Sequence, residues 1–230
     1  MNLDILVVGY LAQESLSEAL SSIVRWSAPG YRLTIHDNSE KNYPLSWLWN
    51  RFIEQSQREF VALVNPDVLV GPGWDTETVA CLEVNPNCAV AAPYTNHDPI
   101  RESYPAIVPD KLALDEIGSI TAEVRAAFKD RRFILSQDKR LTPAHCCVIR
   151  KSAWAKVHGF DEKIPFTGND YDFNYRTIQA GYKVGLCTHA MSFHKWHKSV
   201  DAAIQAGTYD TARQRPRFAV PPPGATWGSI

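Results

Sequence analysis

The first hundred residues alternate between short apolar runs and apolar residues at helical spacing. Residues 3–8 form a run that is apolar apart from Asp4 and is closed by Gly9, which is typical of a strand buried on both faces. Apolar residues then recur at helical spacing over 16–23 and predict an amphipathic helix. The same patterns predict strands at 31–35, 60–64 and 89–92, and helices at 45–53 and from about Thr76. This rhythm predicts an α/β fold with a mainly parallel central sheet flanked by helices.

The alternation breaks over about 95–140, a polar segment with three prolines and one expected helix near 112–128. We interpret this segment as an insertion that forms a lid or a binding loop. Beyond it the pattern predicts a strand at 144–149, helices from Ser152 and at 171–180, and strands near Lys183 and Met191. We therefore expect one domain over 1–200, followed by an extended Pro-rich tail over 201–230.

Composition excludes several classes of protein. With 45% hydrophobic and 21% charged residues over 230 positions, the chain can bury the core of one globular domain. Its net charge of −1 gives no global positive field that would attract nucleic acid or anionic lipid. No stretch approaches the roughly 20 apolar residues that span a bilayer. The five cysteines are odd in number and form no C-x-x-C pair, so we expect a cytoplasmic protein with reduced thiols.

The clearest candidate site is Asn65-Pro66-Asp67, directly after the predicted strand at 60–64. Open α/β sheets bind ligands at the carboxyl ends of their parallel strands. Pro66 directs the backbone out of the strand and so fixes the position of Asp67. The alternative interpretation is an Asx-Pro turn without a ligand.

Two further groups carry candidate chemistry. Asp170 and Asp172 follow Gly168 at the start of a predicted helix, where the helix dipole favours negative charge. They either cap this helix or line a pocket in which one carboxylate acts as a general base. His194 lies at the end of a predicted strand, and its neutral imidazole could complete a metal site with Asp67. The alternative is a surface histidine without a ligand.

The order of these motifs resembles family 2 of the glycosyltransferases, which have the GT-A fold, and within it the rhamnosyltransferase-like branch. The matching motifs are Gly9-Tyr10, Asp37-Asn38-Ser39, Asn42, Asn50, 63–67, Asn85-Pro86, 147–151, 159–162, 169–172, Arg176, 180–182 and His194. They cover about residues 3–200 apart from the insertion. Each motif alone is weakly specific, but their common order is a strong signal.

The resemblance implies a metal-dependent, inverting transfer of a sugar from a nucleotide donor to an acceptor hydroxyl. It assigns Asp37 to the nucleoside and Asp67 and His194 to a Mn²⁺ or Mg²⁺ ion that bridges the diphosphate. It assigns the deprotonation of the acceptor to Asp170, with Asp172 as the alternative. The remaining donor contacts that it implies are Val8, Gly9, Tyr10, Asn50 and Asn65.

The donor would be UDP-, GDP- or dTDP-linked. The acceptor would be a glycan, a lipid-linked molecule or another hydroxyl compound, with nucleic acid as a further alternative. The chain departs from the family in having Asn65 at the first D-x-D position and Asn169 where glutamate is usual.

Two other functions compete with this interpretation. A nucleotidyltransferase needs a basic Gly-rich loop after the first strand, whereas residues 9–14 contain no lysine or arginine. A dinucleotide-binding G-x-G-x-x-G motif is also absent from this position. The second alternative is a non-catalytic module that binds a sugar nucleotide. In the insertion, Arg131, Arg132, Lys139 and Arg140 form a positive cluster that either contacts the acceptor or is solvated.

Overall fold

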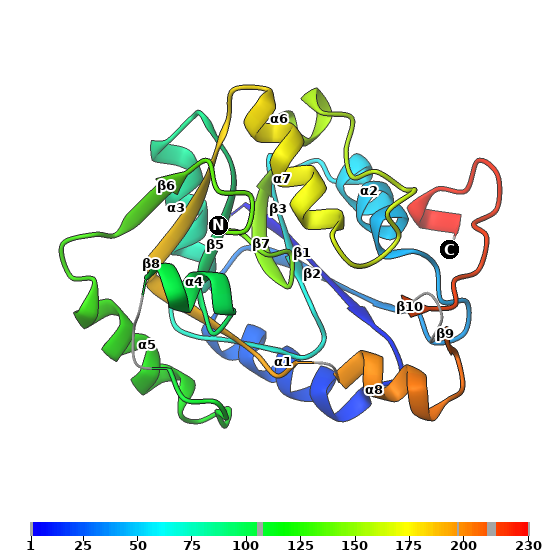
Figure 1. Cartoon of the computed structure of the whole chain (residues 1–230), viewed down its shortest axis with the longest axis horizontal. Coiled ribbons are helices and arrows are strands. Elements are labelled where there is room, and N and C mark those ends of the chain that lie inside the picture. Colours follow the sequence, from blue (N-terminus) through cyan, green and yellow to red (C-terminus); the bar gives the residue numbers. More distant parts are fainter. Residues whose placement is uncertain (1, 105–107, 197, 211–214, 230) are drawn as a thin grey trace.

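The computed structural model describes residues 2–104, 108–196, 198–210 and 215–229, which fold around one large sheet (Figure 1). Its strands are β1 (Leu3–Gly9), β2 (Tyr31–Asp37), β3 (Phe60–Val64), β4 (Val68–Val70), β5 (Cys88–Thr95), β6 (Phe133–Ser136), β7 (Cys146–Arg150) and β8 (Lys183–His194). The order is β2-β1-β3-β7-β5-β8-β4, and β6 pairs with β8. Strands β1, β2, β3, β5 and β8 run in one direction, and β4, β6 and β7 run in the other. The predicted, mainly parallel α/β sheet is confirmed.

Helices cover both faces of this sheet. They are α1 (Gln13–Trp26), α2 (Leu45–Gln55), α3 (Trp74–Val84), α4 (Asp98–Ser103), α5 (Ile117–Ala127), α6 (Lys151–Lys156), α7 (Asn169–Gln179) and α8 (Lys198–Gln205). Successive side chains of β1 point to opposite faces, so Val7 packs with Ile23 of α1 while Leu6 packs with Leu48 of α2. All seven residues of β1 are buried, as its apolar run predicts, and they include Asp4, whose carboxylate pairs with Arg32 and Arg58.

The insertion contains more regular structure than its sequence predicts. The expected helix corresponds to α5, but α4 and the strand β6 also lie in this segment. The two strands expected near Lys183 and Met191 are a single strand, β8. Its register against β5 shifts between Cys187 and Met191, which interrupts the apolar pattern in the sequence. Strand β4 was not predicted because three residues are too few to show a period.

The segment predicted as an extended tail folds back onto the domain. It includes most of α8, a short hairpin of β9 (Tyr209–Asp210) and β10 (Arg215–Pro216), and the terminal 3₁₀ turn Trp227–Ser229. The indole of Trp227 packs at 5.3 Å from the ring of Phe52 in α2 and at 5.2 Å from His36. In Figure 1 this segment runs past α2 towards the C-terminus. Its aromatic residues lack a helical or strand period because they anchor an irregular chain.

No helix among the described residues is both long and apolar enough to cross a membrane.

Candidate functional site

Two adjoining cavities open where β1, β3 and β8 end. The first has a volume of about 320 Å³ and the second about 210 Å³. Their walls share Leu45, Asn65, Phe166, Thr167, His194 and Trp196. The sequence motifs at the ends of the strands thus meet in one place, as expected for an open α/β sheet.

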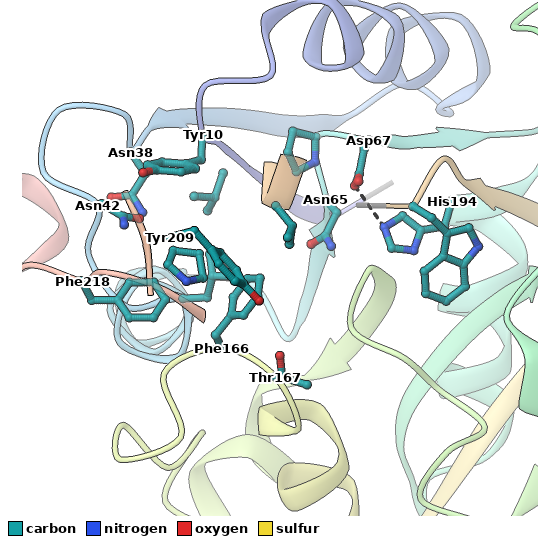
Figure 2. Close-up of a pocket in the computed structure, with 16 residues that line it drawn as sticks. Tyr10, Asn38, Asn42, Asn65, Asp67, Phe166, Thr167, His194, Tyr209 and Phe218 are labelled. Carbon is teal, nitrogen blue, oxygen red and sulfur yellow. Dashed lines mark hydrogen bonds and ion pairs between the residues drawn. The ribbon is translucent and has the colours of Figure 1, made fainter. Parts of the chain in front are cut away.

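The pair of Asp67 and His194 lies at the end of the first cavity next to the second. Their atoms Oδ1 and Nε2 are 3.1 Å apart, and both side chains are nearly buried (Figure 2). Pairing of β4 with β8 brings them together, because Val68 lies opposite His194 and the Lys195 amide donates to the Asp67 carbonyl at 2.8 Å. Two sequence motifs that are far apart in the chain therefore form one unit.

This pair fits a divalent cation that a diphosphate also coordinates. Mg²⁺ is commonly held in proteins by one or two carboxylates together with substrate phosphates and water. Among the described residues no group of three or more His, Cys, Asp or Glu side chains is arranged to hold a metal. A cation held here would take the Asp67 carboxylate and the His194 imidazole as its protein ligands, and phosphate oxygens and water would complete the set. The buried Nδ1 of His194 makes no hydrogen bond within the described structure.

Asn96 fixes the backbone of His194. Its Oδ1 accepts from the His194 amide at 2.9 Å, and its Nδ2 donates to the His194 carbonyl at 3.0 Å. On the other side the ring of His145 stacks on His194 with centroids 4.6 Å apart. Burial lowers the pKa of His145 well below its usual value, and the neighbouring His194 and His97 lower it further. Near pH 7 the His145 ring is therefore neutral and does not repel a cation.

The opposite end of the first cavity is formed by polar and aromatic residues after β1 and β2. Figure 2 shows Tyr10, Asn38 and Asn42 at this end, away from Asp67 and His194. Of the predicted donor contacts, Val8 and Tyr10 line the first cavity and Asn65 lines both. Gly9 is buried beside them, and a Cβ there would lie 3.1 Å from Leu16.

Besides Gly9, two predicted donor residues line neither cavity. Asp37 is exposed and its Oδ1 accepts from the Ser39 amide at 2.9 Å. Hydrogen bonding to Ser39, first through its hydroxyl and then through this amide, lowers the pKa of Asp37. Asn50 is buried in α2, where Oδ1 accepts from the Phe160 amide at 2.8 Å and from the Trp154 indole at 3.1 Å. The Asn50 amide donates to the carbonyl of Phe160 at 2.9 Å. Asn50 thus connects α2 to the loop before α7, and its position offers no donor contact.

The two candidate bases have different surroundings. Asp170 lines the second cavity, and its carboxylate accepts from the amides of Ala144 at 3.1 Å and Tyr171 at 2.9 Å. Burial raises the pKa of Asp170, and these hydrogen bonds oppose the rise. Asp172 lines neither cavity, and its Oδ2 accepts from Arg176 Nε at 2.8 Å one helical turn away. Of these two candidates, only Asp170 lines a cavity.

The C-terminal segment supplies a wall of the first cavity that the sequence did not reveal. Tyr209 and Phe218 line it, and Phe218 lies 6.1 Å from the ring of Phe166. The Tyr10 hydroxyl and the Thr208 hydroxyl are 2.6 Å apart and join this segment to the end of β1. The aromatic residues near the prolines of this segment are the one feature of its sequence that could have indicated that it packs against the domain.

The basic cluster of the insertion lies outside both cavities. Arg132 pairs with Glu77 at 2.7 Å and Arg140 pairs with Asp138 at 2.9 Å. The insertion contributes to the second cavity through His97, and the strand that follows it contributes through His145. The hypothesis that the four cations contact the acceptor receives no support from this arrangement.

Comparison with known proteins identifies the fold. No protein-family model matches the sequence, and no curated protein sequence matches it. Among solved structures the chain is similar to GalNAc-T7, in a crystal structure with UDP, GalNAc and Mn²⁺, with a TM-score of 0.59 and 9% identity. That similarity covers 93% of this chain and 49% of the other, so the chain spans about half the length of GalNAc-T7. It is also similar to residues 1–349 of S. aureus TarS, with a TM-score of 0.56, 11% identity and coverage of 93% and 68%.

Both of these proteins are glycosyltransferases of the GT-A class. The chain has the GT-A fold, as the sequence predicts.

Proposed function

We propose that the chain is a metal-dependent, inverting glycosyltransferase that moves a sugar from a nucleotide donor to an acceptor hydroxyl. The observation that carries this proposal is the Asp67–His194 pair, which lies where two cavities meet. The first cavity takes the donor and the second takes the acceptor, so the sugar is transferred across the junction. The motif order that resembles the rhamnosyltransferase-like branch supports the same function.

The composition of the first cavity supports a metal. A nucleoside diphosphate carries negative charge that increases on the leaving group as the sugar departs. None of the described residues that line this cavity is a lysine or an arginine. A divalent cation bound to Asp67 and His194 would neutralise this charge and stabilise the departing diphosphate. GalNAc-T7 has been crystallised with UDP and Mn²⁺, which makes UDP-sugars and Mn²⁺ the first reagents to test.

Asp170 supplies the base of the proposed reaction. Its carboxylate accepts the proton of the acceptor hydroxyl while the acceptor oxygen forms a bond to the anomeric carbon. The bond from that carbon to the diphosphate breaks, and the nucleoside diphosphate leaves. Attack from the second cavity on a donor held in the first places the two oxygens on opposite sides of the carbon, so the configuration inverts. A burial-raised pKa brings Asp170 closer to the working pH, which favours a general base.

The test is a screen of UDP-, GDP- and dTDP-sugars with Mn²⁺ or Mg²⁺. We expect one nucleotide class to raise the melting temperature only in the presence of the ion, and the matching sugar nucleotide to be hydrolysed slowly. EDTA should abolish both effects. If sugar nucleotides bind in a metal-dependent way but none of them is hydrolysed or transferred, the chain is instead the non-catalytic sugar-nucleotide-binding module.

A further inference from the structure

Trp196 has a backbone conformation that is unusual for a large side chain. Its φ is +51°, in the left-handed region that bulky residues rarely adopt. Such strain persists only where the surrounding structure imposes it, and it is concentrated at functional sites. The indole packs against His194 at 4.6 Å and stacks on His97 at 5.6 Å, and Trp196 remains 37% exposed. The strained backbone thus presents an indole where the two cavities meet.

The second cavity surrounds this indole with aromatic walls and a few polar groups. Trp49, Phe166 and Tyr171 also line it, and Asp170 is its single carboxylate among the described residues. None of the described lining residues is a lysine or an arginine. Its volume of about 210 Å³ is below the roughly 300–1,000 Å³ typical of sites for drug-sized ligands, so it suits a small, uncharged molecule.

We propose that the second cavity binds a neutral sugar ring, stacked on Trp196, as the acceptor of the proposed transfer. A pyranose has one face of C–H groups and a rim of hydroxyls. The C–H face, which is slightly positive, suits the negative face of an indole. Asp170 and Asn65 also line this cavity and offer a carboxylate and an amide to these hydroxyls. This inference rests on the proposed function and adds the chemical class of the acceptor.

The charges near the cavity disfavour a nucleic acid as the acceptor. Binding a nucleic acid requires lysine or arginine side chains that neutralise phosphates. Arg140 pairs with Asp138, and the ammonium of Lys139 lies 5.6 Å from the ring centre of Tyr175. With a net charge of −1, the chain has no surplus of cations to replace these. A neutral sugar requires none.

The experiment measures binding of sugars to the UDP–Mn²⁺ complex of the full chain. The probes are the methyl glycosides of glucose, galactose, mannose, rhamnose and N-acetylglucosamine. Saturation-transfer NMR detects the binding of each one. We expect at least one glycoside to receive saturation mainly at its ring C–H protons. Trp196→Ala and Tyr171→Ala should each weaken its binding roughly threefold to tenfold, the scale of one aromatic contact. Trp196→Phe should recover most of the affinity.

Tyr175→Ala is the matched control, because Tyr175 lies one turn along α7, is half exposed and lines neither cavity. It should leave glycoside binding unchanged. Binding of a nucleoside or of single-stranded DNA, with no glycoside bound, would overturn the proposal and assign the cavity to a nucleobase. Absence of binding by every glycoside also contradicts it. In both cases retained Mn²⁺-dependent binding of the preferred nucleoside diphosphate shows that the donor site of the proposed function stands. Failure of the wild type to bind any nucleoside diphosphate of the donor screen contradicts that function.

Discussion

Asp67 and His194 are 127 residues apart in the chain, yet their Oδ1 and Nε2 atoms lie 3.1 Å apart at the junction of two cavities. The antiparallel register of β4 against β8 brings the two residues together. One carboxylate and one imidazole hold a divalent cation only when the substrate supplies further oxygens. Metal affinity should therefore depend strongly on the nucleoside diphosphate, and nucleotide affinity should depend on the metal in the same way.

Replacement of Asp170 separates catalysis from binding. Asp170→Asn should lower the rate of transfer by about 10²–10⁴, the usual contribution of a general base. The single amide oxygen can accept from only one of the Ala144 and Tyr171 amides, so the melting temperature should fall. UDP affinity should change little, because Asp170 lines the second cavity and not the first. Steady-state rates with the donor and acceptor test this. Asp172→Asn is the matched control and should retain appreciable activity, because its carboxylate contacts Arg176. Normal turnover by Asp170→Asn with an inactive Asp172→Asn would identify Asp172 as the base.

The raised pKa of Asp170 also predicts a pH dependence of stability. Burial raises this pKa above its ordinary value of 3.8, so the folded protein holds this proton more tightly than the unfolded chain. As pH rises from about 3.8 through the raised pKa, the unfolded chain releases the proton first and stability declines, by at most about 1.4 kcal/mol per pH unit. Urea unfolding of the wild type and Asp170→Asn should show a difference in unfolding free energy that falls over this range. A difference that is constant with pH would contradict the assigned shift.

Asn96 should act on metal binding through His194. Asn96→Ala leaves the partly buried amide and carbonyl of His194 without this partner, which costs about 1–3 kcal/mol of stability. Loss of such a supporting contact typically weakens metal binding by about 10–100-fold. Titration of Mn²⁺ in the presence of UDP measures this effect. Asn174→Ala removes a buried asparagine that lines neither cavity. As the control, Asn174→Ala should destabilise the protein and leave Mn²⁺ affinity unchanged. Equal losses of Mn²⁺ affinity in Asn96→Ala and Asn174→Ala would mean that Asn96 has only a structural role.

The C-terminal wall should contribute to donor affinity. Phe218→Ala removes an aromatic side chain from the first cavity, and we expect UDP binding to weaken by about 0.5–1.5 kcal/mol. Val220→Ala, two residues away at a 91% exposed position, is the control and should bind UDP as the wild type does. Calorimetry at saturating Mn²⁺ compares the two. Unchanged UDP binding in Phe218→Ala would exclude the wall from the donor site.

The sequence predicted the sheet and most helices because apolar runs and apolar residues at helical spacing directly reflect which side chains are buried. The candidates Asp67, Asp170 and His194 could be chosen from the sequence because each lies at the end of a predicted strand or helix, and the structure places all three at the cavities. Their roles remain predictions. The sequence did not reveal that β4 pairs with β8, because three residues of β4 show no period. Register between distant strands is a tertiary property, and it decides which candidate residues meet.

The remaining site residues have no local pattern. His145 stacks on the ring of His194, and Trp196 packs against that ring at a tilt. Asn96 forms hydrogen bonds to the His194 backbone. The motif resemblance assigned Asn50 to the donor, whereas the structure fills its hydrogen-bonding groups with Phe160 and Trp154. An asparagine in a helix looks the same in sequence whether it contacts a ligand or a loop.

The most direct test of the proposed function is calorimetric titration of UDP into the wild type and Asp67→Asn, each with Mn²⁺ and with EDTA. If another nucleotide is preferred in the donor screen, its diphosphate replaces UDP. We predict that the wild type binds the nucleotide at least tenfold more tightly with Mn²⁺ than with EDTA. We predict that Asp67→Asn, which loses the ligand charge but keeps the size of the side chain, shows almost no such difference. Nucleotide binding by the wild type that is the same with Mn²⁺ and EDTA, or an undiminished Mn²⁺ effect in Asp67→Asn, would contradict a metal site at Asp67 and His194.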